Sequence, residues 1–334
     1  MRAVQVEEFG GPGVLVVRDV PEPEVGPGRA LVEVTAANVM YLDTLVRGGW
    51  GLDYFPVAPP YVPGAGVAGR VVRVGPGVDP GWEGGTVVAD TGHTDAAPEG
   101  PTLPVDGYAE RAVVPESALV RVPEEVDSRA ALALLHDGPT ALALERAAGF
   151  GPSTTVLVAA AAGGAGTLAV QLARTAGARV IGAARGGAKL ALVRGLGAQE
   201  TVDYSEPDWQ ERVRALTGGA GVDVVLDGAG GALGAAAFET LADGGRFIGY
   251  GSAGGSFTEV DAEEAGRRGI EVLGLFDLKA ADGDRQDALR MALEMARMGR
   301  ITPHVGLTLP LERAAEAHAA LEGRTVLGKV LLVP

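Results

Sequence analysis

The chain has 334 residues, of which 47% are hydrophobic and none is cysteine, and its net charge is −15. This length and composition predict well-filled cores in two domains and exclude disulfides, thiolate catalysis and cysteine metal sites. The acidic balance argues against nucleic-acid and anionic-membrane partners. Because no apolar run of membrane-spanning length and no secretion signal pattern occurs, we expect a cytoplasmic protein.

The N-terminal third is rich in short strand patterns. Apolar alternation between Gly- and Pro-rich turns predicts strands at 1–9, 15–19, 30–34, 84–89 and 107–114. Among them lies the segment 36–49, a short helix or loop that includes Tyr41 and Asp43. With little helix besides, residues 1–124 are expected to form a compact β-rich, barrel-like domain.

Beyond Pro123 the pattern changes to helices and buried strands. Two short helices are predicted at 130–135 and 140–148, interrupted by residues 136–139. Helix patterns at 189–196, 208–216 and 233–241 then alternate with strand patterns at 200–203, 222–226 and 246–250. This alternation predicts an α/β domain with a doubly wound parallel sheet.

The C-terminal stretch leaves this rhythm. It has a strand pattern at 270–275, helix patterns at 284–298 and 311–321, and a closing strand pattern at 329–333. These pieces look like the remainder of the first domain. We therefore expect a nucleotide-binding domain at 125–266, inserted between two parts of the other domain, 1–124 and 267–334.

A glycine-rich turn follows the strand pattern that starts at Val156. The turn precedes a run of apolar residues at helical spacing, and its cofactor-binding candidates are Ala160, Gly163, Gly164, Ala165 and Gly166. A pyrophosphate can approach the backbone N–H groups of such a helix N-terminus because glycine has no side chain to hold it away. The alternative is a glycine turn that only lets the helix pack on the sheet.

The end of the next strand pattern, at 179–184, indicates which dinucleotide binds. NAD sites usually place a carboxylate there, whereas this chain continues with Arg185 and, four residues later, Lys189. We therefore expect that this turn lacks a carboxylate that would repel a 2′-phosphate, and both cations suit that phosphate. This pattern predicts NADPH. The alternative is that both are ordinary solvated loop residues.

These pieces, in this order and spacing, resemble the medium-chain dehydrogenase/reductase superfamily, in particular its zinc-free quinone oxidoreductase (zeta-crystallin-like) branch. The matching segments are 36–48, 63–69, 107–110, 140–141, 160–166, 221–227, 244–246 and 328–330. The resemblance implies a GroES-like catalytic domain, a Rossmann domain and an NADPH site in the cleft between them. It also implies a homodimer, paired through the sheet edge near residues 246–250.

The resemblance also assigns roles to single residues. Catalytic roles are expected for Tyr41, Asp43 and Thr140. Further cofactor-binding positions are Gly228, Gly230, Gly251, Ser252 and Lys329. Tyr41 is either a proton donor or an aromatic wall of the pocket, and His136 is either catalytic or a satisfied loop histidine.

Two departures from the family pattern bear on the chemistry. Zinc-dependent relatives have Gly-His-Glu where this chain has Gly64-Ala65-Gly66, and a cysteine at Met40, so no metal is expected. Quinone oxidoreductases usually have asparagine at Met40. We expect an NADPH-dependent oxidoreductase that reduces a small molecule, a quinone or an α,β-unsaturated carbonyl compound. The alternatives are an enoyl reductase acting on an acyl or biosynthetic intermediate and a non-catalytic NADPH-binding protein, which Met40 favours.

Overall fold

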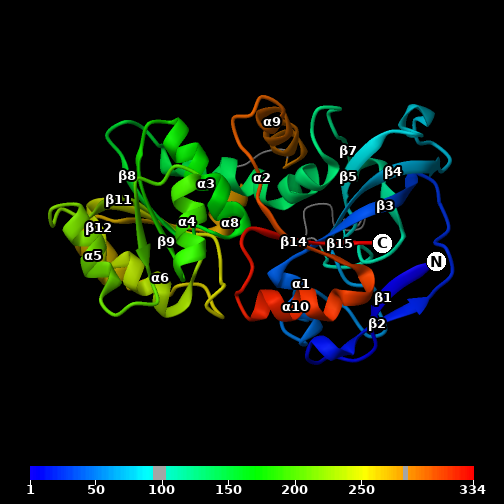
Figure 1. Ribbon diagram of the computed structural model, residues 1–334, viewed down its shortest axis with the longest axis horizontal. Coiled ribbons are helices and arrows are strands. Elements are labelled where there is room, and N and C mark those ends of the chain that lie inside the picture. Colours follow the sequence, from blue (N-terminus) through cyan, green and yellow to red (C-terminus); the bar gives the residue numbers. More distant parts are fainter. Residues whose placement is uncertain (93–102, 281–284) are drawn as a thin grey trace. The chain divides into compact units, whose positions relative to one another are not determined.

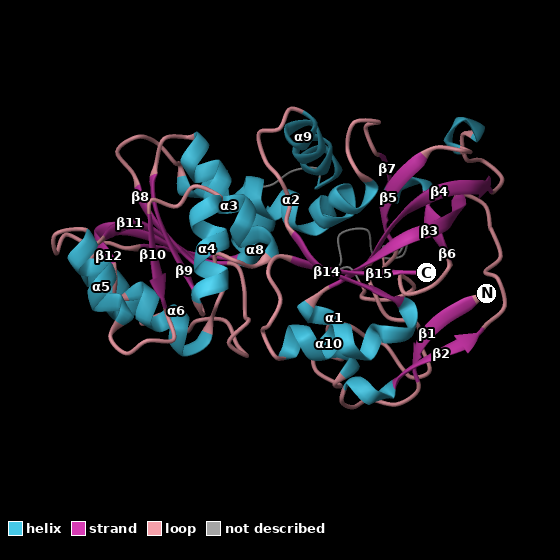
Figure 2. Cartoon of the chain, in the orientation of Figure 1, coloured by secondary structure: helices cyan, strands magenta, loops and turns pink. Residues whose placement is uncertain are grey.

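The computed structural model describes residues 1–92, 103–280 and 285–334. The chain forms two compact units (Figures 1 and 2). Unit 1 consists of residues 1–135 together with 304–334, and unit 2 of residues 136–303. Each has its own hydrophobic core.

Unit 1 is built on a seven-stranded sheet with the order β14-β15-β3-β4-β5-β7, in which β6 also pairs with β3. Its strands are β3 (Arg29–Val39), β4 (Gly66–Val74), β5 (Thr86–Asp90), β6 (Arg111–Pro115), β7 (Leu119–Arg121), β14 (Val305–Pro310) and β15 (Lys329–Val333). A separate hairpin joins β1 (Arg2–Val6) to β2 (Leu15–Asp19). The predicted β-rich character of this unit therefore holds.

The long strand β3 organises unit 1. Its first half pairs with β6 and its last residues pair with β15, while β4 lies along its other side. The strand leads directly into α1 (Tyr41–Arg47), which packs against α10 (Ala314–Glu322). This pairing ties the two chain segments of unit 1 together beside Tyr41.

Unit 2 contains a six-stranded parallel sheet with the order β10-β9-β8-β11-β12-β13. The strands are β8 (Thr155–Ala159), β9 (Arg179–Ala184), β10 (Glu200–Asp203), β11 (Val222–Asp227), β12 (Leu241–Gly249) and β13 (Glu271–Gly274). From β8 the chain proceeds outward to β10 and then returns to β11, next to β8. This reversal is a topological switch point, where open α/β sheets bind ligands at the carboxyl ends of their strands.

Helices cover both faces of this sheet (Figure 1). They are α2 (Ser128–Ala148), α3 (Gly164–Thr175), α4 (Gly187–Gly195), α5 (Trp209–Leu216), α6 (Gly231–Phe238), α7 (Ala262–Arg267) and α8 (Leu275–Ala280). A further helix of unit 2 is α9 (Arg285–Arg297). Because side chains alternate along a strand, Val156 and Val158 face a core with α3 and α4, whereas Leu157 packs in a second core with α5 and α6.

Two features of unit 2 differ from the expectations. The predicted break at residues 136–139 is wrong, because α2 runs through Pro139. Proline removes one backbone hydrogen bond, but the Thr140 hydroxyl donates to the His136 carbonyl at 2.9 Å, and Ala143 and Leu144 pack in the core. Burial of this apolar face offsets the loss of the hydrogen bond.

The second difference concerns the stretch expected to return to the first domain at residue 267. β13 instead pairs in parallel with β12 and completes the nucleotide-binding sheet, and unit 2 continues to residue 303. The prediction that the segment 246–250 forms an edge of the sheet is also wrong, because β12 lies between β11 and β13. In the described part of the chain, no helix is long and apolar enough to cross a membrane.

Candidate active site

The turn after β8 lies at the switch point. Ala160 has a φ of +58°, and its carbonyl accepts the N–H of Gly163 at 2.9 Å. A β-carbon at Gly166 would lie 2.5 Å from the Ala160 carbonyl oxygen, so glycine there lets α3 pack on the turn. Gly166 therefore has a packing role, and this role does not prevent its backbone N–H from binding a ligand.

The start of α3 offers donors to an anion. Gly164, Ala165 and Gly166 occupy its first turn, where backbone N–H groups have no partner within the helix. Gly163, the residue before the helix, is exposed. The donors and the helix dipole together suit a phosphate group.

A second turn, after β11, is held by a buried carboxylate. Asp227 is fully buried, and its Oδ1 accepts the N–H groups of Ala229 and Gly230, both at 2.9 Å. Its Oδ2 accepts the Thr258 hydroxyl at 2.6 Å. Burial raises the pKa of Asp227, while these hydrogen bonds oppose the rise. Sequence reasoning missed this residue, whose effect is to fix the backbone around Gly228 and Gly230.

The turns after β8, β11 and β12 meet. The N–H of Gly228 donates to the Ala159 carbonyl at 3.2 Å, and the N–H of Gly251 donates to the Asp227 carbonyl at 3.2 Å. A β-carbon at Gly251 would lie 2.5 Å from the Gly228 carbonyl oxygen. The structure therefore brings together, at the carboxyl ends of these strands, Gly163–Gly166, Gly228, Gly230, Gly251 and the adjacent Ser252.

The turn after β9 contacts a residue of the neighbouring strand that the sequence reasoning overlooked. Arg185 is exposed there, and Lys189 lies in α4. Asp203 ends the neighbouring strand β10, in register with Ala184, and its Oδ2 accepts the N–H of Gly186 at 2.8 Å. The statement that this turn lacks a carboxylate is therefore wrong, because the carboxylate comes from the adjacent strand.

In unit 1, Tyr41 and Asp43 lie in the first turn of α1. Tyr41 is half-buried, whereas Asp43 is 1% exposed. Asp43 Oδ2 accepts the Met40 N–H at 2.8 Å and the Tyr108 hydroxyl at 2.7 Å. Asp43 Oδ1 has no hydrogen-bond partner among the described residues. Asp43 thus fixes the start of the helix from inside, next to Tyr41.

Asp43 ends a directed chain of buried hydrogen bonds. Arg47 Nη1 lies 3.5 Å from His318 Nδ1, and His318 Nε2 lies 3.1 Å from the Tyr108 hydroxyl. Because arginine can only donate, His318 accepts at Nδ1, which assigns its hydrogen to Nε2. Tyr108 therefore accepts from His318 and donates to Asp43. Gly64 makes room for this ring, because a β-carbon there would lie 2.3 Å from Tyr108.

Burial is the largest influence on the pKa values of Asp43 and His318 in this hydrogen-bond network. It raises the pKa of Asp43 to about 7, against hydrogen bonds from Met40 and Tyr108 and the charge of Lys329. It lowers the pKa of His318 to about 3, and the Arg47 charge acts in the same direction. His318 is therefore neutral at pH 7, and Lys329, predicted at the cofactor, also acts on Asp43 within unit 1.

Thr140 and His136 lie in α2, at the start of unit 2. The Thr140 hydroxyl donates to the His136 carbonyl, so its hydrogen is engaged inside the helix. Thr140 can still accept a hydrogen bond from a ligand.

Comparisons with known proteins agree with this geometry. Residues 26–124 match the family model of the alcohol dehydrogenase GroES-like domain, and residues 196–332 match that of the zinc-binding dehydrogenases. The chain is 32% identical to the 2-haloacrylate reductase of a Burkholderia species, covering 99% of this chain and 98% of the relative. It is 30% identical to human quinone oxidoreductase over 100% of this chain and 98% of the relative.

The chain belongs to the quinone oxidoreductase branch of the medium-chain dehydrogenase/reductase superfamily. Among solved structures, a mycobacterial protein in complex with NADPH has a TM-score of 0.87 and 34% sequence identity, with both chains covered completely. The predicted family and fold class, a Rossmann sheet with a GroES-like domain, are confirmed. The chain is an oxidoreductase of this superfamily.

The residues at the zinc position of the superfamily do not fit a zinc ion. Zinc needs His, Cys or carboxylate ligands, and this chain has Met40 and the buried Ala65 there. Among the described residues, no group of three or more His, Cys, Asp or Glu side chains could hold a metal ion.

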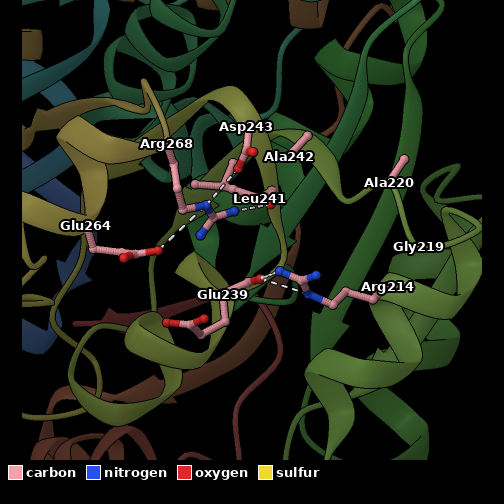
Figure 3. Close-up of a pocket in the computed structure, with 9 residues that line it drawn as sticks. All are labelled: Arg214, Gly219, Ala220, Glu239, Leu241, Ala242, Asp243, Glu264 and Arg268. Atoms are coloured by element: carbon pink, nitrogen blue, oxygen red, sulfur yellow. Dashed lines mark hydrogen bonds and ion pairs between the residues drawn. The ribbon is translucent and has the colours of Figure 1, made fainter.

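Figure 3 shows a hollow of about 510 Å³ in unit 2, whose lining includes none of the residues of the turns after β8, β11 and β12. Residues 219–220, before β11, and 241–243, at the start of β12, line it, so it opens at the amino ends of the strands. Its two arginines are already engaged. Arg214 donates to the Glu239 carbonyl, and Arg268 pairs with Asp243 at 3.0 Å. Since ligands of such sheets bind at the carboxyl ends, we do not assign it a role in the reaction.

Proposed function

We propose that this chain is an NADPH-dependent reductase that acts without zinc on an α,β-unsaturated carbonyl compound or a quinone. The observation that carries the proposal is the set of glycine turns at the switch point, with exposed Arg185 at the end of β9. The Burkholderia relative is named for 2-haloacrylate, which is itself an α,β-unsaturated acid. This name supports an α,β-unsaturated carbonyl compound as the substrate. The human relative is named quinone oxidoreductase, which supports a quinone as the substrate.

The residues of unit 2 fit a dinucleotide. The N–H groups of Gly164, Ala165 and Gly166 would bind its pyrophosphate, because the first turn of α3 leaves them available. Arg185 would hold the 2′-phosphate through its planar guanidinium, with Lys189 adding positive charge. The rest of the dinucleotide site would be formed by the fixed backbone at Gly228, Gly230, Gly251 and Ser252. When bound, NADPH supplies a hydride.

On the acceptor side, the residues must orient the carbonyl and stabilise its oxygen. Hydride addition to an enone leaves negative charge on that oxygen, and a hydrogen-bond donor aimed at it lowers the barrier. Tyr41 provides a phenol beside Met40, on the helix start that Asp43 fixes. Its hydroxyl would donate a hydrogen bond to the enolate oxygen, and water would supply the proton that the α-carbon takes up to complete the saturated product.

The first test measures NADPH oxidation against a panel of quinones and enones. We expect turnover with at least one of them and unchanged activity after treatment with a chelator. The kcat/KM for NADPH should exceed that for NADH by roughly tenfold or more, which is the effect of one charge-assisted contact. In the Arg185→Ala variant the preference should disappear. Tight NADPH binding without turnover of any acceptor would favour the non-catalytic alternative, and turnover of acyl thioesters in preference to free enones would favour the enoyl reductase.

The second test concerns Tyr41. With an enone acceptor, Tyr41→Phe should lower kcat by roughly tenfold to a thousandfold while NADPH affinity is unchanged. Tyr54→Phe is a matched control, because Tyr54 is a highly exposed phenol of the same unit, and its kcat should not change. A silent Tyr41→Phe combined with a raised KM in Tyr41→Ala would make Tyr41 a pocket wall. Wild-type kinetics in Tyr41→Ala would remove it from the site.

A further inference from the structure

Asp203 is a fixed negative charge at the turn that ends β9. Besides the N–H of Gly186, the carboxylate accepts the N–H and the hydroxyl of Ser205, at 2.9 and 2.6 Å. Partial burial acts to raise its pKa, but these hydrogen bonds and the charge of Arg185 together hold the pKa below its ordinary value. Asp203 is therefore ionised at neutral pH and cannot swing away without breaking three hydrogen bonds.

This turn is where a Rossmann unit discriminates between the two nicotinamide dinucleotides. A carboxylate there favours the free 2′-hydroxyl of NADH, and an arginine favours the 2′-phosphate of NADPH. Here both are present, Arg185 directly after β9 and Asp203 at the end of β10. The Arg185 charge already acts on Asp203. A phosphate bound by Arg185 would therefore also be exposed to the Asp203 charge, because screened interactions extend over about 8 Å at physiological salt.

We infer that Asp203 is a specificity-determining residue that limits the preference for NADPH and keeps NADH usable. Its carboxylate opposes the 2′-phosphate directly and offsets part of the Arg185 charge, while the same negative charge costs NADH little. The inference rests on the proposed NADPH function, since it concerns the same subsite.

The test compares dissociation constants for NADPH and NADH, measured by fluorescence titration without an acceptor. Asp203→Asn removes the charge and keeps an oxygen that can accept the Gly186 N–H. We expect the ratio of the NADH to the NADPH dissociation constant to rise roughly three- to thirtyfold, and this gain to shrink at high salt, as screened repulsion requires. Ser205→Ala, which leaves the charge in place, should keep the wild-type ratio.

A merely structural role for Asp203 would weaken both dinucleotides alike and leave the ratio unchanged, which overturns the inference. If Asp203→Asn does not change the ratio but Arg185→Ala lowers it, the inference fails and the proposed function stands. If neither variant changes the ratio, the 2′-phosphate does not bind here and both fail. Should Asp203→Asn not fold, Asp203→Ser, which also lacks the charge, gives the same comparison.

Discussion

Asp43 and His318 are buried in the same network of unit 1, and their pKa values move in opposite directions. Burial raises the pKa of Asp43 to about 7 and lowers that of His318 to about 3. Asp43 therefore contributes stability at low pH that is lost as the pH rises through 7. His318 contributes stability above its unfolded pKa that is lost as the pH falls towards 3. Between about pH 4 and 6.5 the two dependences oppose each other.

We predict that single variants separate these two dependences. In His318→Gln, the free energy of unfolding should fall as the pH rises from 4 to 7, with a slope relative to wild type approaching about 1.4 kcal/mol per pH unit, the value for one proton. In Asp43→Asn it should rise relative to wild type between pH 4 and 6.5. Urea unfolding at a series of pH values measures both. Profiles parallel to that of wild type would show that neither group titrates as its burial requires.

At the scale of elements, the packing of α3 on the turn before it depends on Gly166. Its missing β-carbon leaves the Ala160 carbonyl room to accept the Gly163 N–H, and backbone atoms of Ala161 crowd the same position. Backbone cannot yield as a flexible side chain does. The start of α3, whose N–H groups we propose as donors to the pyrophosphate, is therefore also subject to a packing constraint.

Gly166→Ala should destabilise the protein by about 1–3 kcal/mol, because overpacking shifts backbone, and it should weaken NADPH binding as well. The matched control is Gly195→Ala at the end of α4, where a β-carbon meets no atom within 4 Å. This variant should be neutral or stabilising, since alanine suits a helix better than glycine. Equal thermal unfolding temperatures for the two variants would contradict the packing argument.

At the scale of the whole molecule, we expect a homodimer, with the pairing edge corrected from β12 to β13. In the described sheet β13 pairs only with β12, and Val272 is 42% exposed on it. An unpaired strand edge with exposed apolar residues suits association with a second copy. Sedimentation should therefore show a dimer at micromolar concentration.

Val272→Lys should shift this dimer towards monomer, because a charge would be buried at the pairing edge. Leu216→Lys, at an exposed apolar position of α5, is the matched control and should stay dimeric. A wild-type monomer, or a Val272→Lys dimer as tight as wild type, would remove β13 as the interface.

Much of the fold was predictable because its elements are local patterns. The strand at Val156, the glycine turn and α3 follow from residues adjacent in the chain. Asp203 could not be found in this way, since only the sheet order puts β10 beside β9. The same holds for the contact of Tyr108 with Asp43 and His318, which joins three distant segments. The course of α2 through Pro139 depends on burial, which local propensity does not contain.

The split of unit 1 into two chain segments has a consequence for how the protein is made. On the ribosome, residues 136–303 emerge as one continuous segment and can form their sheet while β15 is still unsynthesised. Until β15 arrives, the last residues of β3, Ala37 to Val39, lack one of their partner strands. The segment that leads into Tyr41 is therefore ordered late, and the nascent chain exposes an open strand edge in the interval. Slow arrival of β15 would make that edge the place where chaperones, or aggregation, first act on this protein.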